Sequence, residues 1–148
     1  MPLAPTHFFV PYLLYDFFQQ HFSKKKSFFF ALLAGLGGAG PDMDFVLAII
    51  YNNLDYHRMV THNYIFPAVI LIAGLILYYL KNKNMALCCT IASFGWASHI
   101  FLDELITPLN LTHFEYGYMD AVVLFTWICW ESWKKRIELK RFISDLKN

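Results

Sequence analysis

Three short motifs in this chain place histidine and aspartate at spacings that suit metal binding. His99 and Asp103, in the string HIFLD, are four residues apart and therefore share one face of a helix. Neutral imidazole and carboxylate together suit zinc or manganese. Taken alone, the pair could instead be hydrogen-bonded at a helix end that faces water. The spacing makes His99 and Asp103 candidate ligands of one divalent cation.

The other two motifs cannot chelate an ion from one straight helix. His57 and His62, in HRMVTH, would point about 140° apart on an ideal helix, and Asp42 and Asp44, in PDMD, about 200° apart. Pro41 favours a break in the helix, because the residue before a proline avoids helical geometry. In a turn, both carboxylates can approach one cation or bridge two. Taken alone, the histidines could be loop residues at an interface, and the aspartates first-turn residues of a helix.

Long apolar stretches around these motifs predict an all-α integral membrane helical bundle. Hydrophobic residues make up 57% and aromatic residues 19% of the 148 residues, which is high for a soluble protein of this size. Residues 64–80 and 85–102 would each cover roughly 26 Å as helices, close to the thickness of a bilayer's hydrocarbon core. Residues 119–133 and the shorter 27–40 complete four firm spans. We expect one transmembrane domain over 1–148 with a basic C-terminal tail.

The N-terminal segment, residues 6–22, is harder to place. It is aromatic enough to enter a membrane, yet it carries Pro11, Asp16 and two glutamines. It can either span the bilayer or lie at the interface as an amphipathic helix. We favour spanning, as a fifth membrane-embedded helix, because the segment ends just before the lysines at 24–26. His7 can then join the other histidines, whereas an interfacial helix would hold His7 a bilayer's thickness away.

The distribution of lysine and arginine predicts the orientation in the membrane. If residues 24–26, 81–83 and everything from Lys134 onward lie in the cytoplasm, eleven of the twelve basic residues are on one side and Arg58 alone is on the other. The loops at 40–63 and 103–118 then face outward with most of the acids and histidines. We expect a protein of the inner (cytoplasmic) membrane, with a cytoplasmic C-terminus and a His/Asp cluster on the extracytoplasmic side. Divalent ions would relieve the cost of clustered carboxylates near lipid.

The order of these motifs resembles the YdjM-type membrane-bound metal-dependent hydrolase family. The family's strings correspond here to Thr6-His7, Pro41-Asp42-Met43-Asp44, His57-Arg58-Met59-Val60-Thr61-His62 and Ser98-His99-Ile100-Phe101-Leu102-Asp103. That family is distantly similar to zinc-dependent phospholipase C and single-strand-specific nucleases, which are helical enzymes that cleave phosphoesters with a His/Asp zinc cluster. The chain departs from the family pattern at Phe45, Asn63 and Thr107. These departures leave the ligands intact and bear on the shape of the substrate.

The resemblance implies hydrolysis of a phosphoester in a phospholipid or lipid-linked phosphate. Two or three divalent ions, zinc first and manganese as the alternative, would lower the pKa of a water and clamp the reacting oxygens. Arg58 is the candidate for bidentate contact with the phosphate, and Asp44 has a catalytic as well as a ligand role. The full expected ligand set is His7, Asp42, Asp44, His57, His62, His99 and Asp103. The further substrate-binding candidates are Thr61, Glu104 and His113.

Two other functions stay open at this point. A metal or ion transporter would need carboxylates deeper inside its helices, where Asp16 alone qualifies. A non-catalytic scaffold or sensor could hold a structural metal in a site filled by protein ligands, whereas a catalytic site keeps a position for water. No nucleic-acid partner is expected, and the oligomeric state is open.

Overall fold

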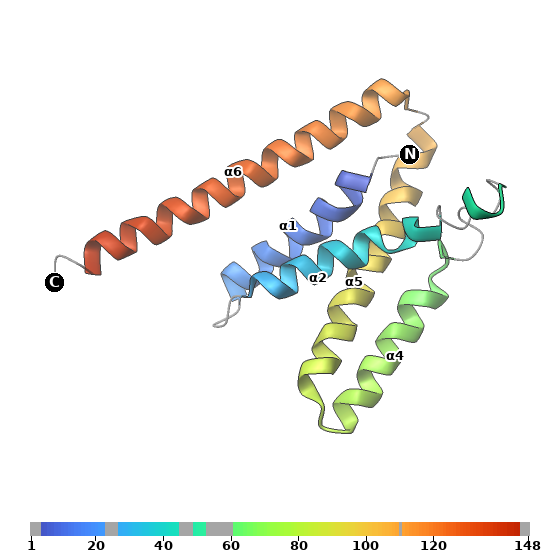
Figure 1. Ribbon diagram of the computed structural model, residues 1–148, viewed down its shortest axis with the longest axis horizontal. Coiled ribbons are helices and arrows are strands. Elements are labelled where there is room, and N and C mark those ends of the chain that lie inside the picture. The colour runs from blue at the N-terminus through green and yellow to red at the C-terminus, as the bar shows by residue number, and fades with distance from the viewer. Residues whose placement is uncertain (1–3, 23–26, 45–48, 53–60, 110, 146–148) are drawn as a thin grey trace.

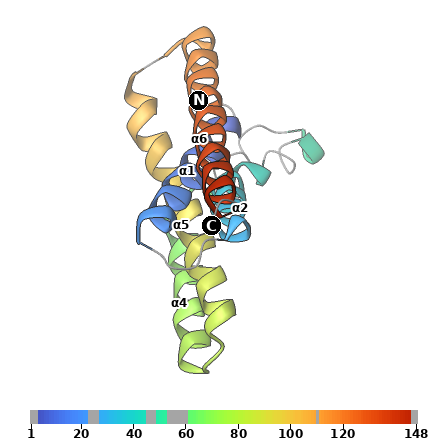
Figure 2. The same ribbon diagram turned by 90° about the vertical axis from the view of Figure 1, so that its left-hand side faces the viewer.

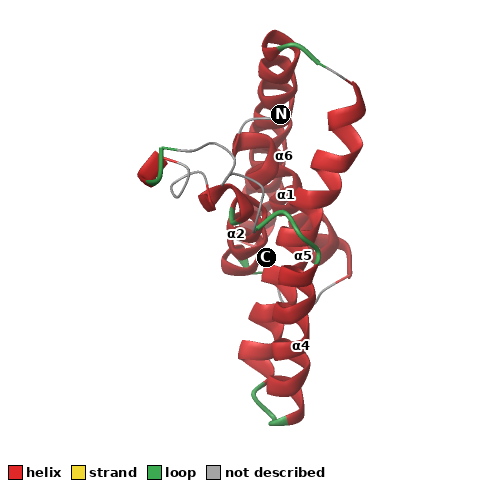
Figure 3. Ribbon diagram, turned by 90° about the vertical axis from the view of Figure 1, so that its right-hand side faces the viewer, coloured by secondary structure: helices red, strands yellow, loops and turns green. Residues whose placement is uncertain are grey.

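The computed structural model describes residues 4–22, 27–44, 49–52, 61–109 and 111–145, which form helices joined by short loops (Figures 1 and 3). This confirms the predicted all-α class. Within these ranges the structure has five α-helices, one for each of the five predicted segments. They are α1 (Ala4–Phe22), α2 (Phe28–Ala39), α4 (Ile65–Tyr79), α5 (Lys83–Ile106) and α6 (His113–Asp145), with 3-10 turns η1 (Pro41–Met43) and η3 (Thr107–Leu109).

Helix α5 is the centre of the bundle. It packs against α4, α2 and α1, while α1 and α2 pack side by side as an antiparallel hairpin (Figure 1). Helix α6 lies along α1 on the side away from α4. The α4–α5 hairpin extends beyond the other helices, as the view turned by 90° shows (Figure 2). Because α5 contacts three helices, side chains on α5 can meet side chains from several other elements.

Two glycines allow three helices to meet at backbone contact. A Cβ atom at Gly95 of α5 would lie 2.2 Å from the carbonyl oxygen of Ala34, and a Cβ at Gly38 of α2 would lie 2.2 Å from the carbonyl oxygen of His7. Neither contact is sterically possible, so glycine is required at both positions. Pro11 has no N–H to donate to the carbonyl of His7, four residues earlier in α1, and Gly38 packs against that same oxygen. These contacts fix where α1, α2 and α5 converge.

In the turn between α4 and α5, Lys81 takes the position where glycine is usual, and Asn82 follows it. The N–H of Asn82 donates to the carbonyl of Leu77 and that of Lys81 to the carbonyl of Tyr78, which is the Schellman pattern. Lys81 occupies the left-handed position, with φ of 63°. Asn82 then caps α5, its side chain accepting a bond of 3.3 Å from the N–H of Met85.

Carboxylates cap the starts of α1 and α6. Asp120 of α6 accepts hydrogen bonds from the backbone N–H of Thr6, at 3.1 Å, and from its hydroxyl. Glu115 accepts from the N–H of Thr112 at 2.7 Å, while its own N–H donates to the Thr112 hydroxyl at 3.3 Å, which forms a capping box. The first cap holds α1 in place directly before His7.

A buried polar cluster joins α1 to α6 nearer the C-terminal end of α1. Asp16 is only 2% exposed, and its carboxylate accepts hydrogen bonds from Lys134 at 2.7 Å, Trp130 at 2.6 Å and Gln19 at 2.7 Å. Lys134 also pairs with Glu131 at 2.7 Å. The pairing explains how a carboxylate fits inside an apolar bundle, and it gives Asp16 a role in helix packing.

By length and composition, α5 is the one described helix that can cross a membrane unaided. The stretch Lys83–Leu109 has 27 residues and a mean hydropathy of 1.5 in its apolar window. Helices α2 and α4 have 12 and 15 residues, about 18 and 22 Å, which is shorter than a hydrocarbon core of roughly 30 Å. The prediction of four firm spans is therefore narrowed to one clear span.

Candidate metal centre

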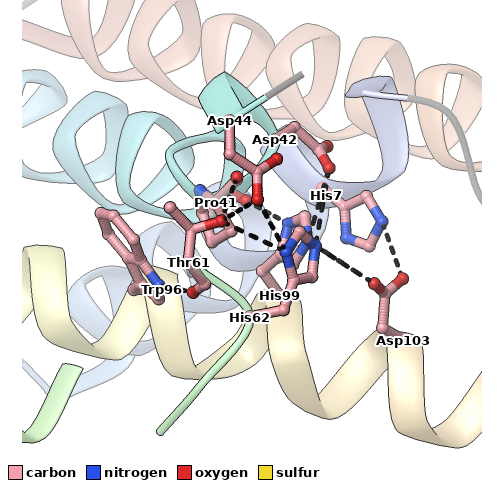
Figure 4. Close-up of polar contacts among 10 residues, drawn as sticks. His7, Pro41, Asp42, Asp44, Thr61, His62, Trp96, His99 and Asp103 are labelled. Atoms are coloured by element: carbon pink, nitrogen blue, oxygen red, sulfur yellow. Dashed lines mark hydrogen bonds and ion pairs between the residues drawn. The ribbon is translucent and has the colours of Figure 1, made fainter. Parts of the chain in front are cut away.

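Five of the predicted ligands meet where α1, α2 and α5 converge (Figure 4). His7 comes from α1, His99 and Asp103 from α5, Asp42 from η1 and His62 from the segment just before α4. His7 and His99 have no exposed surface, and their rings stack with centroids 3.8 Å apart. We call these five residues the metal centre.

The first ligand group in the metal centre combines His7, His99 and Asp103. One ligand atom from each lies within 4.8 Å of the others. Nε2 of His7 is 3.3 Å from Oδ1 of Asp103, and Nε2 of His99 is 3.7 Å from Oδ2 of Asp103. Both ring nitrogens of His7 are buried without a hydrogen-bond partner in the described part of the chain. A buried polar atom without a hydrogen bond destabilises a protein by about 1–3 kcal/mol. A cation bound at Nε2 would offset this cost for Nε2.

The second ligand group combines Asp42, His62 and His99 and shares His99 with the first. Nε2 of His62 lies 3.0 Å from Nε2 of His99, and Oδ1 of Asp42 is 3.9 and 3.6 Å from these two nitrogens. Two imidazole ligands of one tetrahedral zinc ion stand about 3.3 Å apart, given bonds of roughly 2.0–2.1 Å. The spacing of the donors therefore fits a divalent ion.

Asp103 faces both groups with its two carboxylate oxygens. Oδ1 is the oxygen near His7, while Oδ2 lies 3.5 Å from Nε2 of His62. A carboxylate in this position can bridge two ions or hold one ion between the groups. The helical spacing that predicted a shared ion for His99 and Asp103 has brought both side chains into one cluster.

Hydrogen bonds behind two of the histidines set which nitrogen faces the cluster. Nδ1 of His99 lies 2.7 Å from the carbonyl oxygen of Gly38, so Nδ1–H donates and the lone pair of the neutral ring is on Nε2, which faces His62. Nδ1 of His62 lies 3.5 Å from Oδ2 of Asp44, which directs the Nε2 of that ring to the cluster. The Thr61 hydroxyl lies within hydrogen-bond distance of the same Asp44 oxygen. In these contacts Asp44 stands behind His62, in a supporting position. The ligand and catalytic roles expected of Asp44 stay predictions.

Thr61 also holds the loop before α4 against its neighbours. Its hydroxyl lies 2.8 Å from the carbonyl oxygen of Pro41, and its own carbonyl accepts a bond of 2.9 Å from the Trp96 indole. A hydroxyl has one proton, so it can donate to either Pro41 or Asp44 but not to both. The contacts of Thr61 support His62, and substrate binding by Thr61 stays a prediction.

An open pocket of about 440 Å³ adjoins the metal centre. Glu104 lies on its wall and accepts a hydrogen bond of 2.9 Å from the hydroxyl of Tyr64. The pocket is lined by His62, Ile100, Asp103, Glu104, Thr107 and Pro108.

Of the predicted site residues that the structure describes, His113 is not joined to this cluster by any described contact. His113 lines a separate pocket of about 420 Å³ with Phe114, Gly117, Tyr118 and Ala121. His57 and Arg58 lie outside the described residues. The roles assigned to these three side chains remain predictions.

Sequence reasoning missed three residues that position the centre. Gly38, Trp96 and Tyr64 carry no chemistry of their own in a metal site, so residue type gave no reason to select them. The available signals were weak: a double glycine shortly before PDMD, and an indole one helical turn before His99. Their importance follows from how the helices cross.

Comparison with known proteins identifies the family of the chain. No curated protein and no solved structure gives a match. The model of the family described as "YdjM inner membrane protein" matches residues 1–119. The matched region contains the metal centre and the convergence of α1, α2 and α5. The chain therefore belongs to the YdjM family of inner membrane proteins.

Proposed function

We propose that this inner membrane protein is a metal-dependent hydrolase that cleaves a phosphoester of a phospholipid or lipid-linked phosphate. The observation that carries the proposal is the pair of ligand groups that share His99 and open onto a pocket. Imidazole and carboxylate donors in this combination suit zinc, with manganese as the alternative. Divalent ions bound there would polarise a phosphoryl oxygen and lower the pKa of a water molecule.

The protein's own residues would prepare this chemistry by positioning. Gly38 and Asp44 hold the rings of His99 and His62 so that Nε2 of each faces the cluster. The neighbouring pocket leaves room for a phosphate group and a water beside Asp103. Such an opening favours a catalytic centre over a structural ion enclosed by protein ligands. Arg58 retains its proposed role as the phosphate-binding cation.

We also propose that all five α-helices are embedded in the membrane, with the metal centre on the extracytoplasmic side. The support is the exposed apolar surface of α4, where only Pro67 and Gly74 are buried, together with the one-sided distribution of basic residues. Single cysteines at Asn84 and Leu109, at opposite ends of α5, test it in a background without native cysteines. Membrane-impermeant reagents should label the second cysteine from outside the cell and the first only after permeabilisation. The reverse labelling would invert the orientation.

Metal analysis combined with enzyme assays on the detergent-purified protein tests the hydrolase proposal. We expect bound zinc, hydrolysis of a phosphodiester or phosphomonoester probe, and loss of hydrolysis with a chelator that added zinc restores. His99→Ala should lose both metal and hydrolysis, whereas His21→Ala is a matched control. His21 lies near the opposite end of α1 from His7, where it contacts the Phe17 carbonyl.

Two results would contradict different parts of the proposal. Full metal content in His99→Ala would show that the metal centre is wrongly assigned. Bound zinc without hydrolysis of phosphodiester, phosphomonoester or phospholipid probes would reject the enzyme and favour a structural metal.

A further inference from the structure

Glu104 places a carboxylate in the pocket where the proposed substrate would bind. It follows Asp103 directly in α5, and consecutive helical residues point about 100° apart. Asp103 therefore turns toward the histidines, while Glu104 reaches the pocket wall. Neither of the two ligand groups includes Glu104. A second acidic group thus lines the pocket without serving the candidate ions.

Tyr64 holds this carboxylate in place but does not neutralise it. The phenol donates a hydrogen bond of 2.9 Å across from the start of α4 to the carboxylate on α5. Glu104 forms no salt bridge with any described residue. A fixed negative charge repels the phosphate of a substrate that carries no cation. A substrate that also carries a positive group would turn this repulsion into attraction.

We propose that Glu104, oriented by Tyr64, binds a cationic amine, so that the preferred substrate is a phosphoester whose alcohol carries an ammonium group. This inference rests on the proposed hydrolase function, since the metal centre would take the phosphate. The remaining pocket lining, Ile100, Thr107 and Pro108, offers carbon surface to the link between phosphate and amine. The same headgroup chemistry occurs in a membrane phospholipid and in a free phosphoamine.

Ligand binding to zinc-loaded protein in detergent tests the inference without relying on turnover. The soluble probes are phosphoethanolamine and glycerol phosphate, which differ in the ammonium group and are measured by calorimetry. Glu104→Gln should weaken the binding of phosphoethanolamine about two- to fivefold, the range of an exposed charge contact, and should leave the binding of glycerol phosphate unweakened. Tyr64→Phe should give a smaller loss in the same direction. Glu138→Gln, an exposed glutamate of α6, is the matched charge control and should change neither.

Phospholipid probes distinguish the two sources of the headgroup. Phosphatidylethanolamine and phosphatidylglycerol are compared in mixed micelles, for binding and for hydrolysis. A lipid substrate requires tighter binding of phosphatidylethanolamine than of free phosphoethanolamine; the reverse order assigns the site to a soluble phosphoamine. In either case the amine-bearing member of each pair should bind better to the wild-type protein.

The inference and the hydrolase proposal fail in distinguishable ways. Equal weakening of both soluble probes by Glu104→Gln, or loss of zinc from that variant, would overturn the amine-binding role. Equal hydrolysis of amine-bearing and amine-free probes would overturn the amine-binding inference but would leave the hydrolase proposal standing. Amine-selective binding without hydrolysis of any probe would keep the binding role of Glu104 and reject the hydrolase.

Discussion

Replacing Gly38 with alanine should separate α1 from α2 and remove His7 from the metal centre. The added methyl group would lie 2.2 Å from the His7 carbonyl oxygen and 2.5 Å from Cγ of Pro11. An ordinary contact between carbon and oxygen starts near 3.4 Å, so the two backbones must move apart by about 1.2 Å. Metal–ligand distances tolerate only about 0.2 Å. A shift of this size carries the imidazole of His7 out of reach of a shared ion.

The stability change should be visible in the same variant. Overpacking of this kind typically costs about 1–3 kcal/mol, and for a chain of this length each kcal/mol lowers Tm by roughly 2–4 °C. We therefore expect Gly38→Ala to unfold at lower temperature in detergent and to retain less metal after dialysis. Thermal unfolding followed by circular dichroism and elemental analysis of the same sample measure both effects.

Gly117→Ala supplies the control, because a Cβ there meets nothing within 4 Å. Alanine inside a helix is more favourable than glycine by up to about 1 kcal/mol, so this variant should be slightly more stable and keep its full metal content. If Gly38→Ala matched Gly117→Ala in both Tm and bound metal, the close contact between α1 and α2 would be refuted.

Three further perturbations have expected outcomes. Asp44→Asn should weaken zinc binding about 10–100-fold in a metal titration, because it removes the carboxylate behind a histidine ligand. Asp120→Ala should lower the free energy of unfolding, measured by denaturant titration, by about 1–3 kcal/mol. The reason is that the backbone N–H and the hydroxyl of Thr6 lose their acceptor. Lys134→Met should cost about 3 kcal/mol by the same measurement, because it leaves the buried carboxylate of Asp16 unpaired, whereas Lys135→Met should be near neutral.

The helices could be predicted from sequence, but the ends of α6 could not be predicted from hydropathy. Helix α4 matches the expected 64–80 within one residue at each end. Helix α6 begins at His113 and continues to Asp145, well outside the apolar run at 119–133. The reason is that hydropathy marks the part of a helix that suits lipid, while the capping box at Thr112 and the charged residues after Trp133 extend the helix itself.

The ligand types of the metal centre could be predicted, whereas their arrangement could not. Histidine and aspartate spacing identified His99 and Asp103 as partners because both lie on one helix face. Nothing in the spacing distinguished Asp42, which joins a ligand group, from Asp44, which stands behind His62. That distinction depends on η1 lying against the segment just before α4, where the Thr61 hydroxyl contacts the carbonyl oxygen of Pro41. Such contacts between distant segments leave no periodic signal in a single sequence.

The polar residues that made residues 6–22 ambiguous are explained by the neighbours of α1. A helix lying alone at a membrane interface would turn Asp16 and the glutamines to water. Instead α1 packs against α2, α5 and α6, with Asp16 paired to Lys134 on α6 and His7 stacked on His99 of α5. Gln19 in turn donates to Asp16 within α1 at 2.7 Å and exchanges hydrogen bonds with Ser27, just before α2. Asp16, Gln19 and His7 are thus buried against protein partners. The same packing places His7 beside the other candidate ligands, as the spanning alternative predicts. That α1 crosses the membrane stays a proposal.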